Sequence, residues 1–428
     1  MKVKVITLGC KVNQYESQYM LKNLISAGCS ASKPQESCDI VIVNSCTVTS
    51  ISDRKVRQTV HKARRENPSA VIVLTGCLPQ AFPKIAENIS EADIVLGNSN
   101  RSLLLPYIKR FLSSRQRIID ISPHRQGFEP MSVENFYGKT RASVKIEDGC
   151  NQFCSYCIIP YARGRVRSKS FTDLKNELYG ISSNGYKEVV LTGINLSAYG
   201  QEIGLSLCDA VDAACAAESI QRVRLGSLEP ERLDKDVIER LKKQDKLCPQ
   251  FHLSLQSGCD ETLKRMNRKY NSAEYEKIVD NLRGAFPNTS ITTDVMVGFP
   301  GETDEEFKKS LRFVEKIGFA KVHVFAYSRR PGTAADKFKD QIDPRVKEER
   351  SHVMIETTQR LKENFFKKQI GLSEPVLFER ECNKGVFEGY TKNYTPVKAQ
   401  SEKDISGNII NVQITDAFND FCTASIDL

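Results

Sequence analysis

Short apolar segments alternate with helical patterns along most of this 428-residue chain. In the first hundred residues, VKVITLG, DIVIVNS and AVIVLTG have the length and β-branched composition of buried strands. Residues 15–27, between the first two of these segments, carry apolar side chains at helical spacing. Strands that alternate with helices pair in parallel, with the helices packed on the faces of the sheet. The sequence therefore predicts a parallel-sheet α/β domain at the N-terminus.

A cysteine directly follows each of these three strands, at Cys10, Cys46 and Cys77. The carboxyl ends of parallel strands lie at one edge of the sheet, where open α/β sheets bind their ligands. Three thiols at such an edge could bind a metal centre, although free cysteines are also often simply buried. We expect the three side chains to lie close together, and both interpretations stay open at this point.

A second series of strands and helices begins after an irregular, polar stretch. Its predicted strands are ASVKIED, EVVLTG, RVRLGS, FHLSLQ, ITTDVMVGF and KVHVFAY. The clearest helix is TDEEFKKSLRFVEKIG, for which Thr303 is a suitable N-cap and Glu306 completes a capping box. Six strands that alternate with helices predict a central, partial (β/α) barrel.

The last segment changes character. EPVLFERE, GVFEGYT, YTPVKAQ and IINVQITDAF read as short strands separated by turn residues, which is typical of a small all-β barrel. Such barrels often bind nucleic acid, and Tyr390, Asn393 and Tyr394 would contribute if they are exposed; a packing role is the alternative. The predicted organisation is then an N-terminal domain (1–112), a linker (113–138), a barrel (139–367) and a small β-barrel (368–428).

Positive charge is concentrated outside the last segment. The formal net charge of the chain is +9, which divides into +12 for residues 1–367 and −3 for residues 368–428. Affinity for a polyanion would therefore lie mainly in the first two domains. Two basic runs are candidates for phosphate contact, or else form solvated surfaces: Arg54, Lys55, Arg57, Lys62, Arg64 and Arg65 in the first, and Arg163, Arg165, Arg167 and Lys169 in the second.

The segment GCNQFCSYC contains three cysteines, Cys150, Cys154 and Cys157, in a C-x3-C-x2-C pattern. Three thiolates leave one coordination position of an iron-sulfur cluster open, and that iron can bind a small molecule. A structural zinc site is the alternative, but closed zinc sites need four ligands and usually contain paired C-x2-C motifs. The spacing favours a cluster.

The fourteen cysteines of the chain also bear on its location. The apolar run in MKVKVITLGC is too short for a signal peptide, and the sequence contains no apolar stretch of the length that spans a bilayer. Without export, many cysteines indicate metal binding or burial in a reducing compartment. We therefore expect a cytoplasmic protein that does not bind membranes.

The C-x3-C-x2-C run resembles the signature of the radical S-adenosylmethionine (SAM) superfamily. Together with the strand-end cysteines and the C-terminal β-barrel, the chain resembles the radical SAM methylthiotransferase family, whose last domain is called TRAM. The resemblance implies two [4Fe-4S] clusters, one on Cys10, Cys46 and Cys77 and one on Cys150, Cys154 and Cys157. It also implies that the second cluster cleaves SAM to a radical, and that a methylthio group is attached to an unactivated carbon.

The same resemblance implies which residues contact SAM at the barrel cluster. They are Tyr156, through its backbone, together with Gly193, Asn195, Ser227, Glu229 and Gln256. Several of these follow predicted barrel strands, where side chains favour roles in a site over roles in stability. For each polar position, a satisfied hydrogen bond at a strand end is the alternative.

The motifs TLGCKVNQYES and GYTKNYTPV resemble the MtaB-type branch of the family. That branch acts on C2 of N6-threonylcarbamoyladenosine at tRNA position 37. The implied partners are the tRNA anticodon arm and an electron donor such as flavodoxin or ferredoxin; no residue identifies the sulfur donor. Alternatives are the same chemistry on isopentenylated adenosine 37 or on a small-subunit ribosomal protein, and a non-catalytic iron-sulfur protein that binds RNA.

Overall fold

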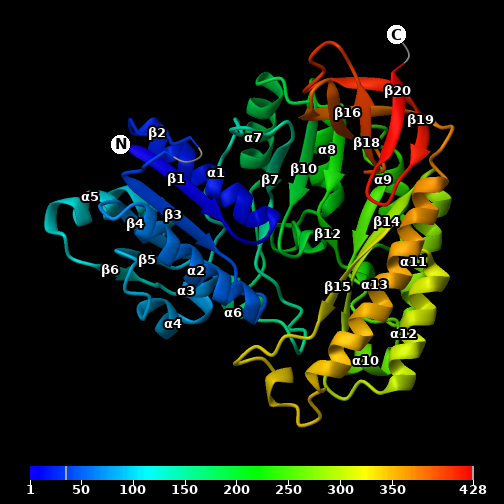
Figure 1. Cartoon of the computed structure of the whole chain (residues 1–428), viewed down its shortest axis with the longest axis horizontal. Helices are drawn as coiled ribbons and strands as arrows, with labels where there is room; N and C mark the ends of the chain where they lie inside the picture. The colour runs from blue at the N-terminus through cyan, green and yellow to red at the C-terminus, as the bar shows by residue number, and fades with distance from the viewer. Residues whose placement is uncertain (34–35, 427–428) are drawn as a thin grey trace.

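A parallel six-stranded sheet forms the N-terminal part of the computed structural model, which describes residues 1–33 and 36–426. The strand order is β2-β1-β3-β4-β5-β6 (Figure 1). The strands are β1 (Lys2–Thr7), β2 (Ser30–Ala31), β3 (Ile40–Ser45), β4 (Val71–Gly76), β5 (Ile94–Leu96) and β6 (Ile118–Asp120). The helices are α1 (Lys11–Ser26), α2 (Ser50–Glu66), α3 (Cys77–Ala81), α4 (Pro83–Glu87) and α5 (Leu104–Ser114).

Helices cover both faces of this first sheet. Every residue of β3 and β4 is buried, as expected for central strands of a parallel sheet. Met20 and Leu24 of α1 pack with α5 on one face, and Val56 and Val60 of α2 pack on the other. The three strands predicted from the sequence are present. Helix α1 begins earlier than expected, at Lys11, because Cys10 takes the N-cap position.

The polar stretch expected to be irregular contains part of this sheet. Strand β6 pairs with β5 in parallel, with Ile118 opposite Ile94. Strands β2, β5 and β6 have at most three residues each, too few for hydrophobic periodicity to reveal them.

The middle of the chain forms the predicted partial barrel. Its strands are β7 (Ala142–Lys145), β10 (Glu188–Thr192), β11 (Arg222–Leu225), β12 (Ser227–Leu228), β13 (Gln250–Leu253), β14 (Ser290–Val297) and β15 (Lys321–Ala326). All pair in parallel, in the orders β11-β10-β7 and β12-β13-β14-β15. Only Gly226 separates β11 from β12, so the two sheets follow one another as one series. Each of the six predicted strands is present, and RVRLGS is divided between β11 and β12.

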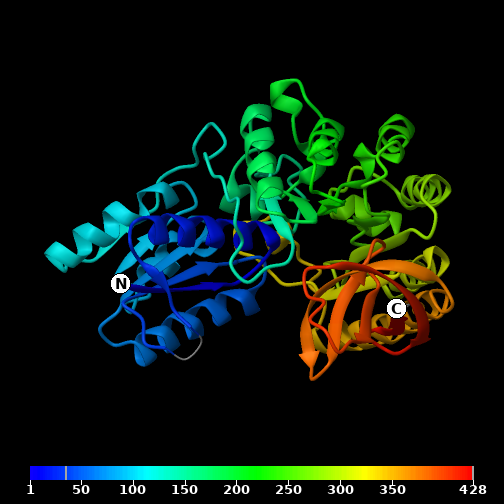
Figure 2. The ribbon, with the colours of Figure 1, turned by 90° about the horizontal axis from the view of Figure 1, so that it is seen from above.

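Helices pack on one face of this series, and the green helices in Figure 2 form an arc around it. The helices in this part of the chain are α6 (Ile159–Arg163), which packs against α3, and α7 (Phe171–Ser183), α8 (Leu207–Ala216), α9 (Lys235–Lys242), α10 (Asp260–Arg265), α11 (Ser272–Ala285), α12 (Asp304–Ile317) and α13 (Pro344–Lys367). Thr303 caps α12 and Glu306 completes its capping box, as predicted. A short antiparallel ribbon pairs β8 (Glu147–Asp148) with β9 (Arg167–Ser168). The 3₁₀ helices are η1 (Arg101–Leu103), η2 (Leu196–Ala198), η3 (Gln201–Ile203), η4 (Pro230–Arg232) and η5 (Ala335–Lys337).

The C-terminal segment is a closed β-barrel with the order β16-β17-β18-β20-β19. Its strands are β16 (Ser373–Asn383), β17 (Val386–Thr391), β18 (Pro396–Gln400), β19 (Ile409–Ala417) and β20 (Cys422–Ile426). Strand β20 was not among the four predicted strands. Arg222 and Arg224 of β11 donate hydrogen bonds to backbone carbonyls of the small barrel, at Tyr390 (2.9 Å) and Lys392 (3.0 Å). These contacts hold it against the partial barrel (Figure 1).

Candidate active site

The sheet order brings Cys10, Cys46 and Cys77 to one edge. They follow β1, β3 and β4, which are neighbours in the first sheet. Two glycines allow this approach. Gly9 has φ +119°, and a Cβ there would lie 2.8 Å from the Cβ of Cys46. Gly76 has φ +101°, and its Cβ would lie 2.5 Å from the carbonyl oxygen of Ser45. Both positions exclude larger residues.

Arg163 reaches this first cysteine site from the partial barrel. It ends α6, which begins two residues after Cys157. Its Nε donates to the Sγ of Cys77 at 3.3 Å, and its Nη2 donates to Asn13 Oδ1 at 2.8 Å. Its side chain is fully buried. Arg163 belongs to a basic run that is a candidate for phosphate contact, but its burial against the cysteine site excludes that role.

A buried network of charges surrounds Arg163. Its Nη1 lies 2.6 Å from Glu16 Oε1, and Lys145 of β7 lies 2.8 Å from the same oxygen. Burial alone would raise the pKa of Glu16, but the surrounding cations, first that of Arg101, lower it to about 2. Glu16 therefore stays ionised and joins α1 to the barrel.

The barrel cysteines lie in the loop between β8 and α6. Arg268 Nη1 donates to the Sγ of Cys154 at 3.1 Å, and Arg268 Nη2 is paired with Glu229. Asn195 Nδ2 lies 3.7 Å from the Sγ of Cys150. Arg268 is not among the site residues predicted from the sequence, because its segment RKY carries no recognisable motif. Only folding brings it to a cysteine 114 residues away.

Glu147 is a second residue that the sequence did not reveal. Its Oε2 accepts a hydrogen bond from the backbone N–H of Asn195 at 2.7 Å, and a Cβ on Gly193 would lie 2.7 Å from the same oxygen. Burial raises the pKa of Glu147 well above its usual value. The Oε1 of Glu147 and the Oδ1 of Asn195 are buried and have no hydrogen-bond partner among the described residues. Such acceptors suit the ammonium or hydroxyl groups of a bound molecule.

The other residues expected to contact SAM occupy strand ends and loops of the barrel. Ser227 lies in β12 and is exposed. Gln256 has φ +65°, and its backbone N–H donates to the carbonyl oxygen of Asp294 at 2.9 Å. Tyr156 packs edge-on against Phe299, with ring centroids 6.4 Å apart. Of the six predicted residues, Asn195 contacts Cys150 directly, Glu229 is linked to Cys154 through Arg268, and Gly193 lies beside Glu147.

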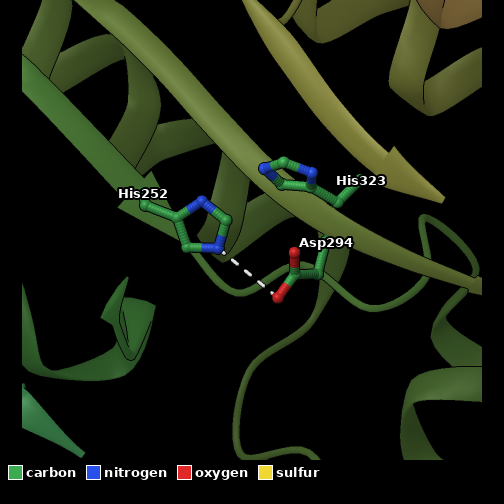
Figure 3. Close-up of side chains that lie close together, drawn as sticks. All are labelled: His252, Asp294 and His323. Atoms are coloured by element: carbon green, nitrogen blue, oxygen red, sulfur yellow. Dashed lines mark ion pairs between the residues drawn. The ribbon is translucent and has the colours of Figure 1, made fainter. Parts of the chain in front are cut away.

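His252, Asp294 and His323 meet on β13, β14 and β15 (Figure 3). Their ligating atoms lie within 4.8 Å of one another, which is close enough for one metal ion. His252 Nε2 lies 3.4 Å from Asp294 Oδ2, and its Nδ1 lies 3.0 Å from Thr292 Oγ1. Both ring nitrogens of His252 thus have partners within the chain.

Within residues 1–33 and 36–426, the cysteine triplets do not form a single-ion group of this kind. A mononuclear zinc site would draw each sulfur to about 2.3 Å from one ion. An iron-sulfur cluster instead distributes its thiolates over several irons.

Comparison with known families agrees with this chemistry. Residues 144–314 match the Radical SAM superfamily, and residues 2–97 match the Uncharacterized protein family UPF0004. A relative from Thermotoga maritima, "Threonylcarbamoyladenosine tRNA methylthiotransferase MtaB", is 40% identical over 92% of this chain and 90% of its own length. The chain belongs to the MtaB-type radical SAM methylthiotransferases.

Two further relatives and one solved structure are also similar to this chain. The Bacillus subtilis protein of the same name is 37% identical over 96% of this chain and 93% of its own length. A "tRNA-2-methylthio-N(6)-dimethylallyladenosine synthase" of Finegoldia magna is 33% identical over 97% of this chain and 92% of its own length. Among solved structures, the radical SAM methyltransferase TsrM from Kitasatospora setae matches with a TM-score of 0.57 and 13% identity, over 84% of this chain and 89% of that chain. That likeness concerns the fold alone.

Membership of the radical SAM superfamily implies SAM and a [4Fe-4S] cluster, and the barrel cysteines have the chemistry to hold one. Burial raises the pKa of Cys150 to about 12, so the thiol is protonated at neutral pH until a metal displaces the proton. The first site is similar, because burial, and next to it the Cys77 thiol, raise the pKa of Cys46 to about 12. Three thiols at each site fit a cluster with one open iron.

The basic run on α2 is a candidate surface for RNA. Arg54, Lys55, Arg57, Lys62 and Arg65 are exposed, whereas Arg64 is paired with Asp93 at 2.6 Å. Lys169 of the second basic run is buried against Glu177. In the described part of the chain, no helix combines the length and the apolar composition needed to cross a membrane.

Proposed function

We propose that this enzyme methylthiolates C2 of N6-threonylcarbamoyladenosine at position 37 of tRNA. Cys10, Cys46 and Cys77 would hold one [4Fe-4S] cluster, and Cys150, Cys154 and Cys157 would hold the other. The names of the relatives from Thermotoga maritima and Bacillus subtilis support the substrate. A tRNA substrate in turn fits a cytoplasmic enzyme that receives electrons from a donor such as flavodoxin or ferredoxin.

The observation that carries this proposal is the position of Arg163. It leaves the barrel a few residues after Cys157 and ends 3.3 Å from the Sγ of Cys77. The next residue, Gly164, accepts a hydrogen bond from the backbone N–H of Cys150 at 3.0 Å, so Arg163 and Gly164 together contact both cysteine sites. A reaction that uses both sites on one substrate needs them to face each other, and this contact supports such an arrangement.

When bound, the barrel cluster and SAM would supply the radical that removes hydrogen from the substrate carbon, and the first cluster would carry the sulfur. The chain's own residues would position these groups. Arg268, held by Glu229, places a positive charge on Cys154. Asn195 and Glu147 would accept hydrogen bonds from SAM through their unpartnered oxygens. We propose that Tyr156, Gly193, Ser227 and Gln256 complete the SAM site.

The test is anaerobic reconstitution with iron and sulfide, followed by incubation with reductant, SAM and anticodon stem-loops. One stem-loop carries threonylcarbamoyladenosine and a second carries isopentenyladenosine. We expect mass spectrometry of digested nucleosides to show a methylthio group on the first. A methylthio group only on the second would mean that isopentenyladenosine, and not threonylcarbamoyladenosine, is the substrate. SAM binding without 5′-deoxyadenosine formation would support the non-catalytic RNA-binding alternative.

A further inference from the structure

A cavity of about 330 Å³ lies where three parts of the chain meet. Lys11 and Gln14 of α1 line one side, Arg141 and Ser143 at the start of β7 line another, and the C-terminal barrel closes it. Lys11 is the first residue of α1 and directly follows Cys10, the N-cap of that helix, in the chain.

The charges that line this cavity do not balance. Its cations are Lys11, Lys139, Arg141 and Arg380, and its anions are Glu379 and Glu388. Glu379 is paired with Arg141 at 2.5 Å, and Glu388 is paired with Arg380 at 2.6 Å. Lys11 and Lys139 have no ion pair among the described residues. Two ammonium groups therefore remain, which favours an anionic ligand.

The C-terminal barrel gives the cavity a rigid wall. Tyr390 and Tyr394 stack with centroids 4.5 Å apart, and the guanidinium of Arg141 lies 5.1 Å from each ring. Both tyrosines, together with Asn393, are the residues expected from the sequence to contact nucleic acid if they are exposed. Asn393 is buried and donates to Gln369 Oε1 at 3.0 Å, so it belongs to the packing of this wall.

We propose that this cavity binds the carboxylate of the threonylcarbamoyl group, with the ammonium of Lys11 as its counter-ion. The inference rests on the function proposed above. On adenine, C2 and C6 flank N1, so a base whose C2 faces the two cysteine sites projects its N6 substituent to the side. Lys11 lies next to Cys10, where such a substituent would pass. An isopentenyl group has no charge to match the two lysines.

The experiment compares two anticodon stem-loops that differ only in the threonylcarbamoyl group. Binding to the reconstituted full-length enzyme is measured by fluorescence anisotropy for wild type, Lys11→Met, Lys11→Arg and Lys139→Met. Lys109→Met is the matched control, because Lys109 is exposed on α5 and does not line the cavity. Iron content per chain establishes that each variant retains its clusters.

We expect wild type to bind the modified stem-loop about tenfold more tightly, as one additional ion pair allows. Lys11→Met should remove most of this preference and Lys139→Met part of it, whereas Lys11→Arg and Lys109→Met should retain it. Equal weakening of both stem-loops by Lys11→Met would mean that Lys11 meets an RNA phosphate, and would overturn the inference. So would an unchanged preference in both lysine-to-methionine variants of the cavity.

Turnover separates this inference from the proposed function. If wild type adds a methylthio group to the modified stem-loop while the Lys11→Met and Lys139→Met variants keep the preference, only the carboxylate site is wrong. If wild type adds none to that stem-loop and acts on the isopentenylated one, the proposed substrate fails and the carboxylate site fails with it.

Discussion

The first cysteine site takes its side chains from the ends of three strands, whereas the barrel site takes all three from one eight-residue segment, 150–157, of a single loop. The first site therefore depends on the packing of the whole sheet, and the second depends mainly on local chain geometry. They also differ in their charged neighbours. A guanidinium from another part of the chain contacts Cys77 in the first site, while Arg268 of the same barrel contacts Cys154 in the second.

The largest expected effect separates the two sites by the product they lose. Cys154→Ala should abolish both 5′-deoxyadenosine and the methylthio product, because SAM cleavage needs the barrel cluster. Cys10→Ala should abolish the methylthio product and leave 5′-deoxyadenosine formation. Both are read by mass spectrometry, with Cys29→Ala as a control for loss of a buried thiol outside the sites. Loss of both products in Cys10→Ala would contradict the division of roles.

Arg163→Met should damage the first site far more than the second. It leaves Glu16 and Asp148 without one of their buried partners, which costs about 3–5 kcal/mol of unfolding free energy. Denaturant unfolding measures this loss of stability. Mössbauer spectroscopy should show that the iron bound at the first site falls while the barrel cluster remains. Arg350→Met is the control, because Arg350 is buried against Glu302 at 2.8 Å and its ion pairs, to Glu302 and Asp304, lie outside both cysteine sites. An equal loss of iron in both variants would reduce the role of Arg163 to stability.

Gly76→Ala tests the dependence of the first site on the strand ends. The added Cβ would lie 2.5 Å from a backbone oxygen, in a conformation with φ +101°. We expect a loss of roughly 2 kcal/mol and weaker cluster binding at the first site. Gly28→Ala is matched in strain, since Gly28 has φ +89° with nothing within 4 Å. It should cost about 1 kcal/mol and leave iron binding intact. Similar iron contents in the two variants would show that the collision is relieved.

Arg268→Met should have the smallest effect and should be confined to the barrel site. Removing the cation beside Cys154 disfavours the reduced cluster, so its reduction potential should fall. SAM cleavage should slow about tenfold, as expected for the loss of a hydrogen bond to a charged group. Arg265→Met is the control, because Arg265 pairs with Glu306 outside the site. A potential that stays unchanged in a redox titration followed by electron paramagnetic resonance would refute this role.

Much of the fold could be predicted because its signals are local. The buried strands β3 and β4 are continuous apolar runs, and the cap of α12 is encoded within four residues. Strands β2, β5 and β6 were missed because a run of two or three residues has no period. Strand β20, CTASI, was missed because its small and polar residues do not alternate clearly.

The amino-acid sequence alone determined which cysteines we propose as ligands, three at each site, and their positions after strands, since spacing along the chain encodes all of these. Only the tertiary structure decided which charged side chains lie beside the cysteines and beside one another. Arg163 reaches Glu16 across 147 residues, and His252 lies beside Asp294 because their strands are paired in register. The cavity beside Lys11 needs three parts of the chain at once. Such contacts arise from packing between distant elements, for which local sequence carries no signal.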